Sequence, residues 1–259
     1  MRKIFTVALL DVMGFADKIE SSQLIDIGKK YKKFVTDMKL LNQPLRPSPE
    51  SKTLFPNHPK GKPWCWQTVI SDSIILISED DSLDSFMKLI LYVWRFSQYC
   101  LCFDMPVRGA VTFGEMFVDR RENITIGKPL TKAHKLEKEQ NWIGIVIDDT
   151  VVDSFPDFFS NLNDLWSMLL YKYNVPFKKE KTKNMHTINW RFNFKSKKGT
   201  KLLFSTDGPK DVMEKIENTL KYAKEIVKTK KVYISGDVPN ELVTFLCGPQ
   251  PSFEHGDDL

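Results

Sequence analysis

Two aspartates stand at the ends of apolar runs in the first third of this 259-residue chain. Asp11 ends the run IFTVALL, and Asp72 stands in the short Ser71-Asp72 break between the apolar runs WCWQTVI and SIILIS. Carboxylates suit Mg²⁺ and Mn²⁺, which generally complete their coordination with substrate phosphates. If the first strand lies beside the hairpin, both carboxylates reach one end of a sheet. The pattern then indicates a two-cation site for phosphoryl transfer.

Each aspartate also has a purely structural interpretation. Asp is common in hairpin turns, which would explain Asp72, and Asp11 could be the N-cap of the helix that follows it. The pair favours the metal site, because an acid directly after IFTVALL is otherwise poorly placed. Gly14-Phe15 adds to this, since a glycine between a strand and a helix lets the backbone approach a phosphate closely.

The elements that must position these residues follow from the apolar periodicity. Up to residue 149 we predict three strands, one hairpin and three helices in the order βαββαβαβ: strand 4–10, helix 17–41, a hairpin around 71–72, helix 82–103, strand 107–118, helix 129–140 after Gly127, and strand 143–149. Residues 119–123 read as a polar turn. Six prolines within residues 42–63 predict a long loop there.

The second half of the chain gives a weaker pattern. We predict a helix over 161–173, strands over 187–194 and 201–206, a helix over 210–229 and a disordered polar tail from Gly248. The expected fold class is α+β. We expect a single domain over residues 1–247, with its core motifs in 4–152, a C-terminal extension over 153–247 and the tail at 248–259.

Composition limits the class of protein. The chain is 42% hydrophobic and 27% charged, with a net charge of +5, and this mild excess does not indicate a nucleic-acid partner. No signal peptide is recognisable, and no apolar run approaches the roughly 18 residues of a membrane span. The four cysteines, Cys65, Cys100, Cys102 and Cys247, match neither a zinc site nor a disulfide framework. We therefore expect a cytoplasmic protein with reduced thiols and no membrane association.

Four segments together resemble a known family. LLDVMGFAD is similar to the opening motif of the class III nucleotidyl cyclases, the catalytic domains of adenylyl and guanylyl cyclases, and ISDSIIL resembles their hairpin with a second metal-binding Asp. PVRGAVTFGEMF resembles their strand with Arg and, six positions later, Gly. ITIGKPLTKAHKLEKEQNWIGIVIDDTV is similar to their closing helix and strand. The resemblance covers roughly residues 4–152 in the family's order.

The resemblance implies a ferredoxin-like βαββαβ core with extra C-terminal strands and a helix, and a homodimer with sites shared between subunits. It implies that Asp11 and Asp72, with the Val12 carbonyl, hold two divalent cations, Mn²⁺ or Mg²⁺. Gly14 and Phe15 would contact the phosphates of a nucleoside triphosphate, and Arg108 would pair with the triphosphate through its guanidinium fork.

Several positions depart from the family's pattern. Thr68 stands where purine cyclases have a base-reading Lys or Glu, four residues before the second Asp. Thr131 and Lys135 replace the Asn and Arg that act on the transition state, and Lys135 keeps the charge without the bidentate fork. Ser71 replaces the glycine before the second Asp.

These departures make the chain most similar to the stand-alone pyrimidine cyclases of the Pycsar antiphage defence system. A neutral Thr68 between Trp64 and Trp66 would suit a pyrimidine, although core packing explains the two tryptophans equally well. The resemblance favours UTP over CTP as the substrate of a uridylate or cytidylate cyclase, while the residues themselves leave this open. The alternative is a catalytically inactive, cyclase-like nucleotide sensor. A polymerase palm or diguanylate cyclase would need a different acid pattern.

Overall fold

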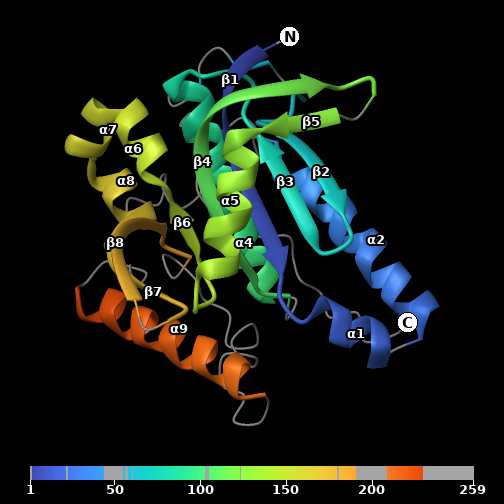
Figure 1. Cartoon of the computed structure of the whole chain (residues 1–259). Helices are drawn as coiled ribbons and strands as arrows, with labels where there is room; N and C mark the ends of the chain where they lie inside the picture. The colour runs from blue at the N-terminus through green and yellow to red at the C-terminus, as the bar shows by residue number, and fades with distance from the viewer. Residues whose placement is uncertain are drawn as a thin grey trace.

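The computed structural model describes residues 2–21, 23–43, 55, 58–59, 61–102, 105–122, 124–179, 181–190 and 209–229. They build one mixed sheet with helices on both faces (Figure 1). The strand order is β2-β3-β1-β4-β6-β8-β7, with β5 paired to β4. The pairing of β4 with β6 is parallel, and the other pairings between these strands are antiparallel. The α+β fold class is confirmed.

The strands are β1 (Arg2–Val12), β2 (Trp66–Ile70), β3 (Ser73–Ile77), β4 (Val107–Asp119), β5 (Ile124–Gly127), β6 (Ile145–Ile147), β7 (Leu170–Phe177) and β8 (Lys181–Ile188). The helices are α1 (Phe15–Ser21), α2 (Leu24–Leu41), α4 (Leu83–Cys102), α5 (Lys128–Glu139), α6 (Asp149–Ser154), α7 (Pro156–Ser160), α8 (Asp164–Leu169) and α9 (Lys210–Lys228). None of the described helices is both long enough and apolar enough to cross a membrane.

β1 lies inside the sheet, between β3 and β4. It pairs with β4 along its whole length, from Arg2 opposite Phe117 to Val12 opposite Val107. Because helices cover both faces of this strand, its residues are apolar in a nearly continuous run rather than in alternation. The run ends with Asp11, which lies opposite Ser73 on one side and Arg108 on the other.

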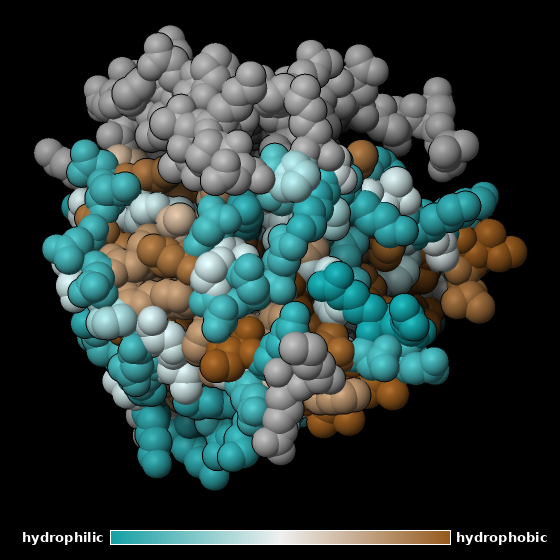
Figure 2. Space-filling model, turned by 90° about the horizontal axis from the view of Figure 1, so that it is seen from above, coloured by the Kyte–Doolittle hydropathy of each residue, from teal (hydrophilic) through white to brown (hydrophobic). Residues whose placement is uncertain are grey.

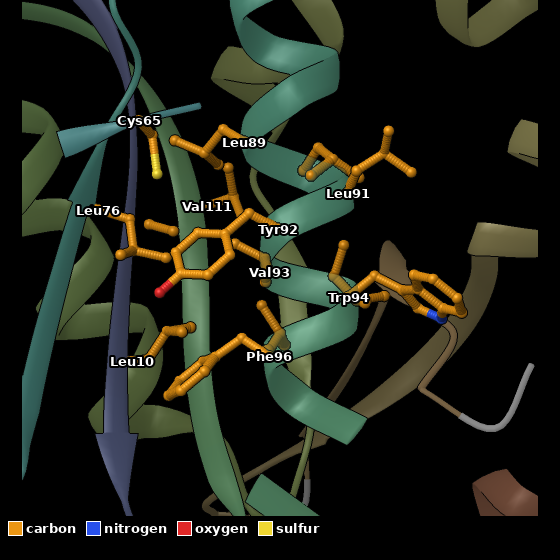
Figure 3. Close-up of a cluster of buried hydrophobic side chains, with 14 of the residues drawn as sticks. Leu10, Cys65, Leu76, Leu89, Leu91, Tyr92, Val93, Trp94, Phe96 and Val111 are labelled. Carbon is orange, nitrogen blue, oxygen red and sulfur yellow. The ribbon is translucent and has the colours of Figure 1, made fainter. Parts of the chain in front are cut away.

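The sheet separates two hydrophobic layers. On one face α4 packs against Leu10, Leu76 and Val111, and Figure 3 shows Tyr92 and Phe96 of this helix pointing toward those strands. Trp94 points away from them and donates its indole N–H to the Asn189 carbonyl at 3.1 Å. On the other face α5 lies over β1 and β4, and α9 packs nearby (Figure 1).

The predicted hairpin is confirmed, with a two-residue turn at Ser71-Asp72. The predicted strand 4–10 and the helices 82–103, 129–140 and 210–229 are also found, with slightly shifted bounds. The single helix predicted over 17–41 is wrong. α1 ends at Ser21 and α2 begins at Leu24, because Gln23 adopts an extended conformation (φ −67°, ψ 131°) that a helix cannot continue through.

The C-terminal predictions were less accurate. Residues 170–173, predicted as helix, are the start of β7, because β7 pairs with β8 from Leu170 to Phe177. β8 runs from Lys181 to Ile188, so the strand predicted over 187–194 begins six residues too late, and its residues 191–194 lie outside the described residues. The strand predicted over 143–149 is only three residues long, since Asp148 caps α6 by accepting from the Thr150 N–H at 3.0 Å.

Other predictions lie wholly or partly outside the described residues. These are most of the loop 42–63, the strand 201–206, the tail 248–259 and Cys247. Cys65 and Cys100 are buried free thiols, as expected. The short elements β5, α6 and α7 were not predicted.

The close pairing of β1 with β4 generates a test at Gly109. A Cβ there would clash with the Leu9 carbonyl oxygen and lie 2.6 Å from Leu10 Cδ2. Gly109→Ala should therefore lower the free energy of unfolding by about 1–3 kcal/mol, as measured by urea denaturation.

Gly28→Ala is the matched control, because a Cβ at this α2 position meets nothing within 4 Å. It should raise the stability by about 0.5–1 kcal/mol, since alanine is the better helix former. Equal effects of the two substitutions would contradict the described packing of β1 on β4.

Candidate nucleotide and metal site

Asp11 and Asp72 meet at the end of the sheet from which α1 emerges (Figure 1). Asp11 lies directly opposite Ser73, the residue after Asp72, and the Val12 N–H donates to the Asp72 carbonyl at 2.9 Å. The strand end and the hairpin turn are thus hydrogen-bonded to each other. The structure brings together the two acids that the sequence singled out.

A buried chain of charges begins at Asp11. Nη2 of Arg108 lies 3.8 Å from Asp11 Oδ2. The same guanidinium donates through Nε to Glu137 Oε1 at 2.8 Å and also through Nη2 to this oxygen, while Nη1 donates to the Gln140 carbonyl at 3.4 Å. The side chains of Glu137 and Arg108 are 1% and 7% exposed. A buried carboxylate therefore fixes the cation that stands beside Asp11.

The pKa of Asp11 is raised above its ordinary value, chiefly by burial and then by the negative charge of Glu137. Lys138 and Arg108 oppose this shift, and the charge of Asp72 adds to it. Asp11 is therefore a carboxylate that folding places where its negative charge is unfavourable. A cation bound between Asp11 and Asp72 would relieve that repulsion.

The turn after β1 is open on the side of Gly14. Gly14 has φ +71°, a left-handed conformation that favours glycine, and a Cβ at this position would meet nothing within 4 Å. Phe15 is buried, with its ring centroid 5.0 Å from that of Tyr31. A phosphate in this turn could meet the backbone of Phe15 but not its ring.

The predicted base pocket lies on the same face of the sheet as Asp11. Thr68 is opposite Ile75, which is opposite Leu9, and residues directly opposite each other share a face. Thr68 is partly buried. Since Leu9 and Asp11 are two residues apart in β1, Thr68 stands two residues along the strand direction and two strands across from Asp11, roughly 12 Å away.

The two tryptophans beside Thr68 differ in their surroundings. Trp64 is 5% exposed and packs against Phe55 and under the guanidinium of Arg95, as core packing predicts. Trp66 is partly buried and lies 3.1 Å from the guanidinium carbon of Arg120, measured to the ring centroid. Only Trp66 stands on the face that Thr68 and Asp11 share.

Thr131 and Lys135 lie on the exposed side of α5, one turn apart. Lys135 is 75% exposed, and its Nζ is 4.0 Å from Glu139 Oε1. The buried side of the same helix carries Ala133 and Glu137. Within one chain, therefore, these two residues point away from the aspartates.

The sequence interpretation missed Glu137 and Tyr31. The sequence could have pointed to Glu137, because it follows Pro129 and Ala133 at helical spacing on the buried side of α5. A buried carboxylate there needs a positively charged partner. Nothing in the sequence marks Tyr31, whose hydroxyl donates to the Ser71 carbonyl. Among the described residues no group of three or more His, Cys, Asp or Glu side chains could hold a metal ion.

Comparison with known proteins shows similarity in structure only. No family model and no curated protein matches the sequence. The catalytic core of a rhodopsin-guanylyl cyclase with converted specificity, solved in complex with ATPαS, aligns with a TM-score of 0.51 at 10% identity, over 73% of this chain and 96% of that one. The chain has the fold of a class III nucleotidyl cyclase domain.

Two further cyclases align with lower scores. The adenylyl cyclase CyaB from P. aeruginosa gives a TM-score of 0.49 at 11% identity, over 73% of this chain and 94% of that chain. The guanylyl cyclase domain of the RhoGC fusion protein from Blastocladiella emersonii gives 0.48 at 9% identity, over 73% and 96%. Both alignments have low identity and add no argument beyond the likeness in fold.

The raised pKa of Asp11 predicts how the metal-free protein responds to pH. Because the folded state holds this proton to a higher pH than the unfolded state, stability falls as pH rises through the folded pKa. Asp11→Asn should therefore raise the free energy of unfolding at pH 7 in the presence of EDTA, and weaken this dependence, in urea denaturation at several pH values.

Asp153→Asn is the control, because Asp153 is exposed on α6, away from the charge chain. It should leave the stability nearly unchanged. A loss of stability in Asp11→Asn at pH 7 would show that the attraction of Arg108 outweighs the burial of Asp11.

Proposed function

We propose that the protein is a nucleotidyl cyclase that converts a pyrimidine nucleoside triphosphate, UTP in preference to CTP, to the 3′,5′-cyclic monophosphate and pyrophosphate. The observation that carries the proposal is the convergence of Asp11 and Asp72 beside Arg108, on a class III cyclase fold. From the resemblance of the sequence to the Pycsar cyclases, we further propose that the product is a second messenger in antiphage defence.

The donor set fits two divalent cations, Mn²⁺ or Mg²⁺. Asp11, Asp72 and the Val12 carbonyl supply hard oxygen ligands, and such ions usually take their remaining ligands from water and substrate phosphates. When bound, the cations lower the pKa of the ribose 3′-hydroxyl and neutralise charge on the phosphates.

The reaction joins the ribose O3′ to the α-phosphorus and breaks the bond from that phosphorus to the oxygen of the leaving pyrophosphate. Asp11 and Asp72 would hold the cations at the end of the sheet, where the reacting end of the substrate would lie. Gly14 leaves room for the phosphates at the β1–α1 turn. Arg108, held by Glu137, keeps a positive charge beside this turn, where negative charge develops on the phosphates.

Thr68 supports the pyrimidine assignment. Its hydroxyl can both donate and accept, which serves the O4 or N4 edge of a pyrimidine without a fixed charge. Trp66 is partly buried on the same face, and the side of its ring that Arg120 does not cover offers a surface for stacking.

A homodimer would complete the site. Thr131 and Lys135 are exposed on the side of α5 away from the aspartates, so they can reach a site only in a second subunit. The β4–β5 hairpin also exposes the apolar side chains of Phe117, Ile124 and Ile126, which are 41%, 39% and 64% exposed. Figure 2 looks onto the end of the molecule where this hairpin lies and shows hydrophobic residues among hydrophilic ones. Such exposed apolar groups suit a protein interface.

The first test is product formation. The purified protein, incubated with each of the four nucleoside triphosphates and Mn²⁺, should yield a cyclic pyrimidine nucleotide, identified by chromatography and mass spectrometry. Asp11→Asn and Asp72→Asn should each lower kcat at least a hundredfold, because each removes a metal ligand, whereas Asp153→Asn should not. A cyclic purine product would overturn the base assignment, and no product from any of the four would favour the inactive nucleotide sensor.

The second test is complementation between subunits. Asp72→Asn and Lys135→Ala should each be nearly inactive alone, yet their mixture should regain up to about a quarter of the wild-type activity, because half of the dimers would be mixed and each would hold one intact site. Asp72→Asn mixed with Asp11→Asn is the control, since both changes damage the same half of each site. Activity in the control but not in the first mixture would contradict the shared site.

A further inference from the structure

The turn that carries Asp72 has a backbone conformation that favours glycine at its first position. Ser71 has φ +54°, and Lys179 is the only other described non-glycine residue with positive φ, so φ of Asp72 is negative. A two-residue hairpin turn with positive φ at its first position and negative φ at its second has the sign pattern of type II′. Serine adopts this conformation only when its surroundings hold it there.

Tyr31 provides a hydrogen bond that can stabilise this conformation of Ser71. Its hydroxyl, on α2, donates to the carbonyl of Ser71, 40 residues further along the chain. The next carbonyl, that of Asp72, accepts from the Val12 N–H at 2.9 Å. Two consecutive carbonyls of the turn are therefore anchored, one to α2 and the other to the end of β1.

The ring of Tyr31 is itself fixed on both sides. Its centroid lies 5.0 Å from that of Phe15, which follows the Gly14 turn, and 5.9 Å from that of Phe34, which is 1% exposed. One side chain thus contacts the β1–α1 segment through its ring and the β2–β3 turn through its hydroxyl.

The charge of Asp72 also acts on Tyr31. Burial, and then this negative charge, raise the pKa of the Tyr31 hydroxyl, which therefore stays protonated and able to donate at neutral pH.

We propose that Tyr31 is a positioning residue that fixes Asp72 against Asp11, and that its hydrogen bond compensates for serine in place of glycine at position 71. This inference rests on the proposed function, because positioning Asp72 serves catalysis only if Asp72 is a metal ligand. The hydrogen bond itself can be tested without any turnover.

The test is a double-mutant cycle with Tyr31→Phe, Ser71→Gly and the double variant. Tyr31→Phe keeps both ring contacts and removes only the hydroxyl, so the protein should still fold, as checked by thermal unfolding. Tyr171→Phe is the matched control, since its hydroxyl bonds Glu225 at 2.9 Å on another part of the molecule.

Three measurements apply to each variant: the hydrogen-exchange rate of the Val12 amide by NMR, the affinity for Mn²⁺ by calorimetry, and kcat with KM for the active nucleotide. Tyr31→Phe should speed Val12 exchange and weaken Mn²⁺ binding by roughly fivefold each, the effect of one hydrogen bond, and should lower kcat in proportion. The double variant should match Ser71→Gly alone, because glycine adopts a positive φ without a stabilising hydrogen bond.

The outcomes separate the two proposals. Unchanged Val12 exchange and Mn²⁺ affinity in Tyr31→Phe would overturn the positioning role, even if the wild type is an active cyclase. Additive effects in the double variant would overturn the compensation. If the wild type forms no cyclic nucleotide but exchange and Mn²⁺ affinity respond as expected, the proposed function fails while the positioning of Asp72 stands.

Discussion

The pairing of β1 with its two neighbours is the constraint on which the candidate site depends. β1 is hydrogen-bonded to β3 and β4, and helices bury both of its faces, so its register cannot slip without moving apolar side chains out of a core. That register places Asp11 opposite both Ser73 and Arg108. A strand at an edge of the sheet could not bring together acids from two segments and a guanidinium from a third.

Charge is arranged around Asp11 at a cost to the folded state. Burial and the neighbouring acids disfavour its carboxylate, and Arg108 offsets this only in part because Glu137 shares its guanidinium. Because Arg108 is held by Glu137, it does not form a close ion pair with Asp11 that would neutralise the Asp11 carboxylate. Residues that bind a ligand commonly hold such unfavourable interactions, which the ligand then relieves.

The departures from the cyclase pattern fall into two groups. Under the proposed function, Thr68, Thr131 and Lys135 would contact a substrate or a second subunit. None of the three is fully buried, so a change there would alter recognition without disturbing the core. Ser71 is different, since it occupies a backbone conformation that favours glycine. The hydroxyl of Tyr31, which is distant in the sequence, donates a hydrogen bond to the carbonyl of Ser71. The serine at this position is thus accompanied by a tertiary contact to the same turn.

The parts of the structure that depend on local pattern could be predicted from the amino-acid sequence. The apolar run ending in Asp11, the two-residue turn at Asp72 and the helices α4, α5 and α9 follow from periodicity and turn chemistry. The strand conformation of residues 170–173 depends on a tertiary contact, because pairing of β7 with β8 outweighs the local helical preference. Tertiary contacts also decide the surroundings of the acids. Glu137 is far from Asp11 in the chain, and Tyr31 is far from Ser71, so only folding creates the contacts that set their charge and position.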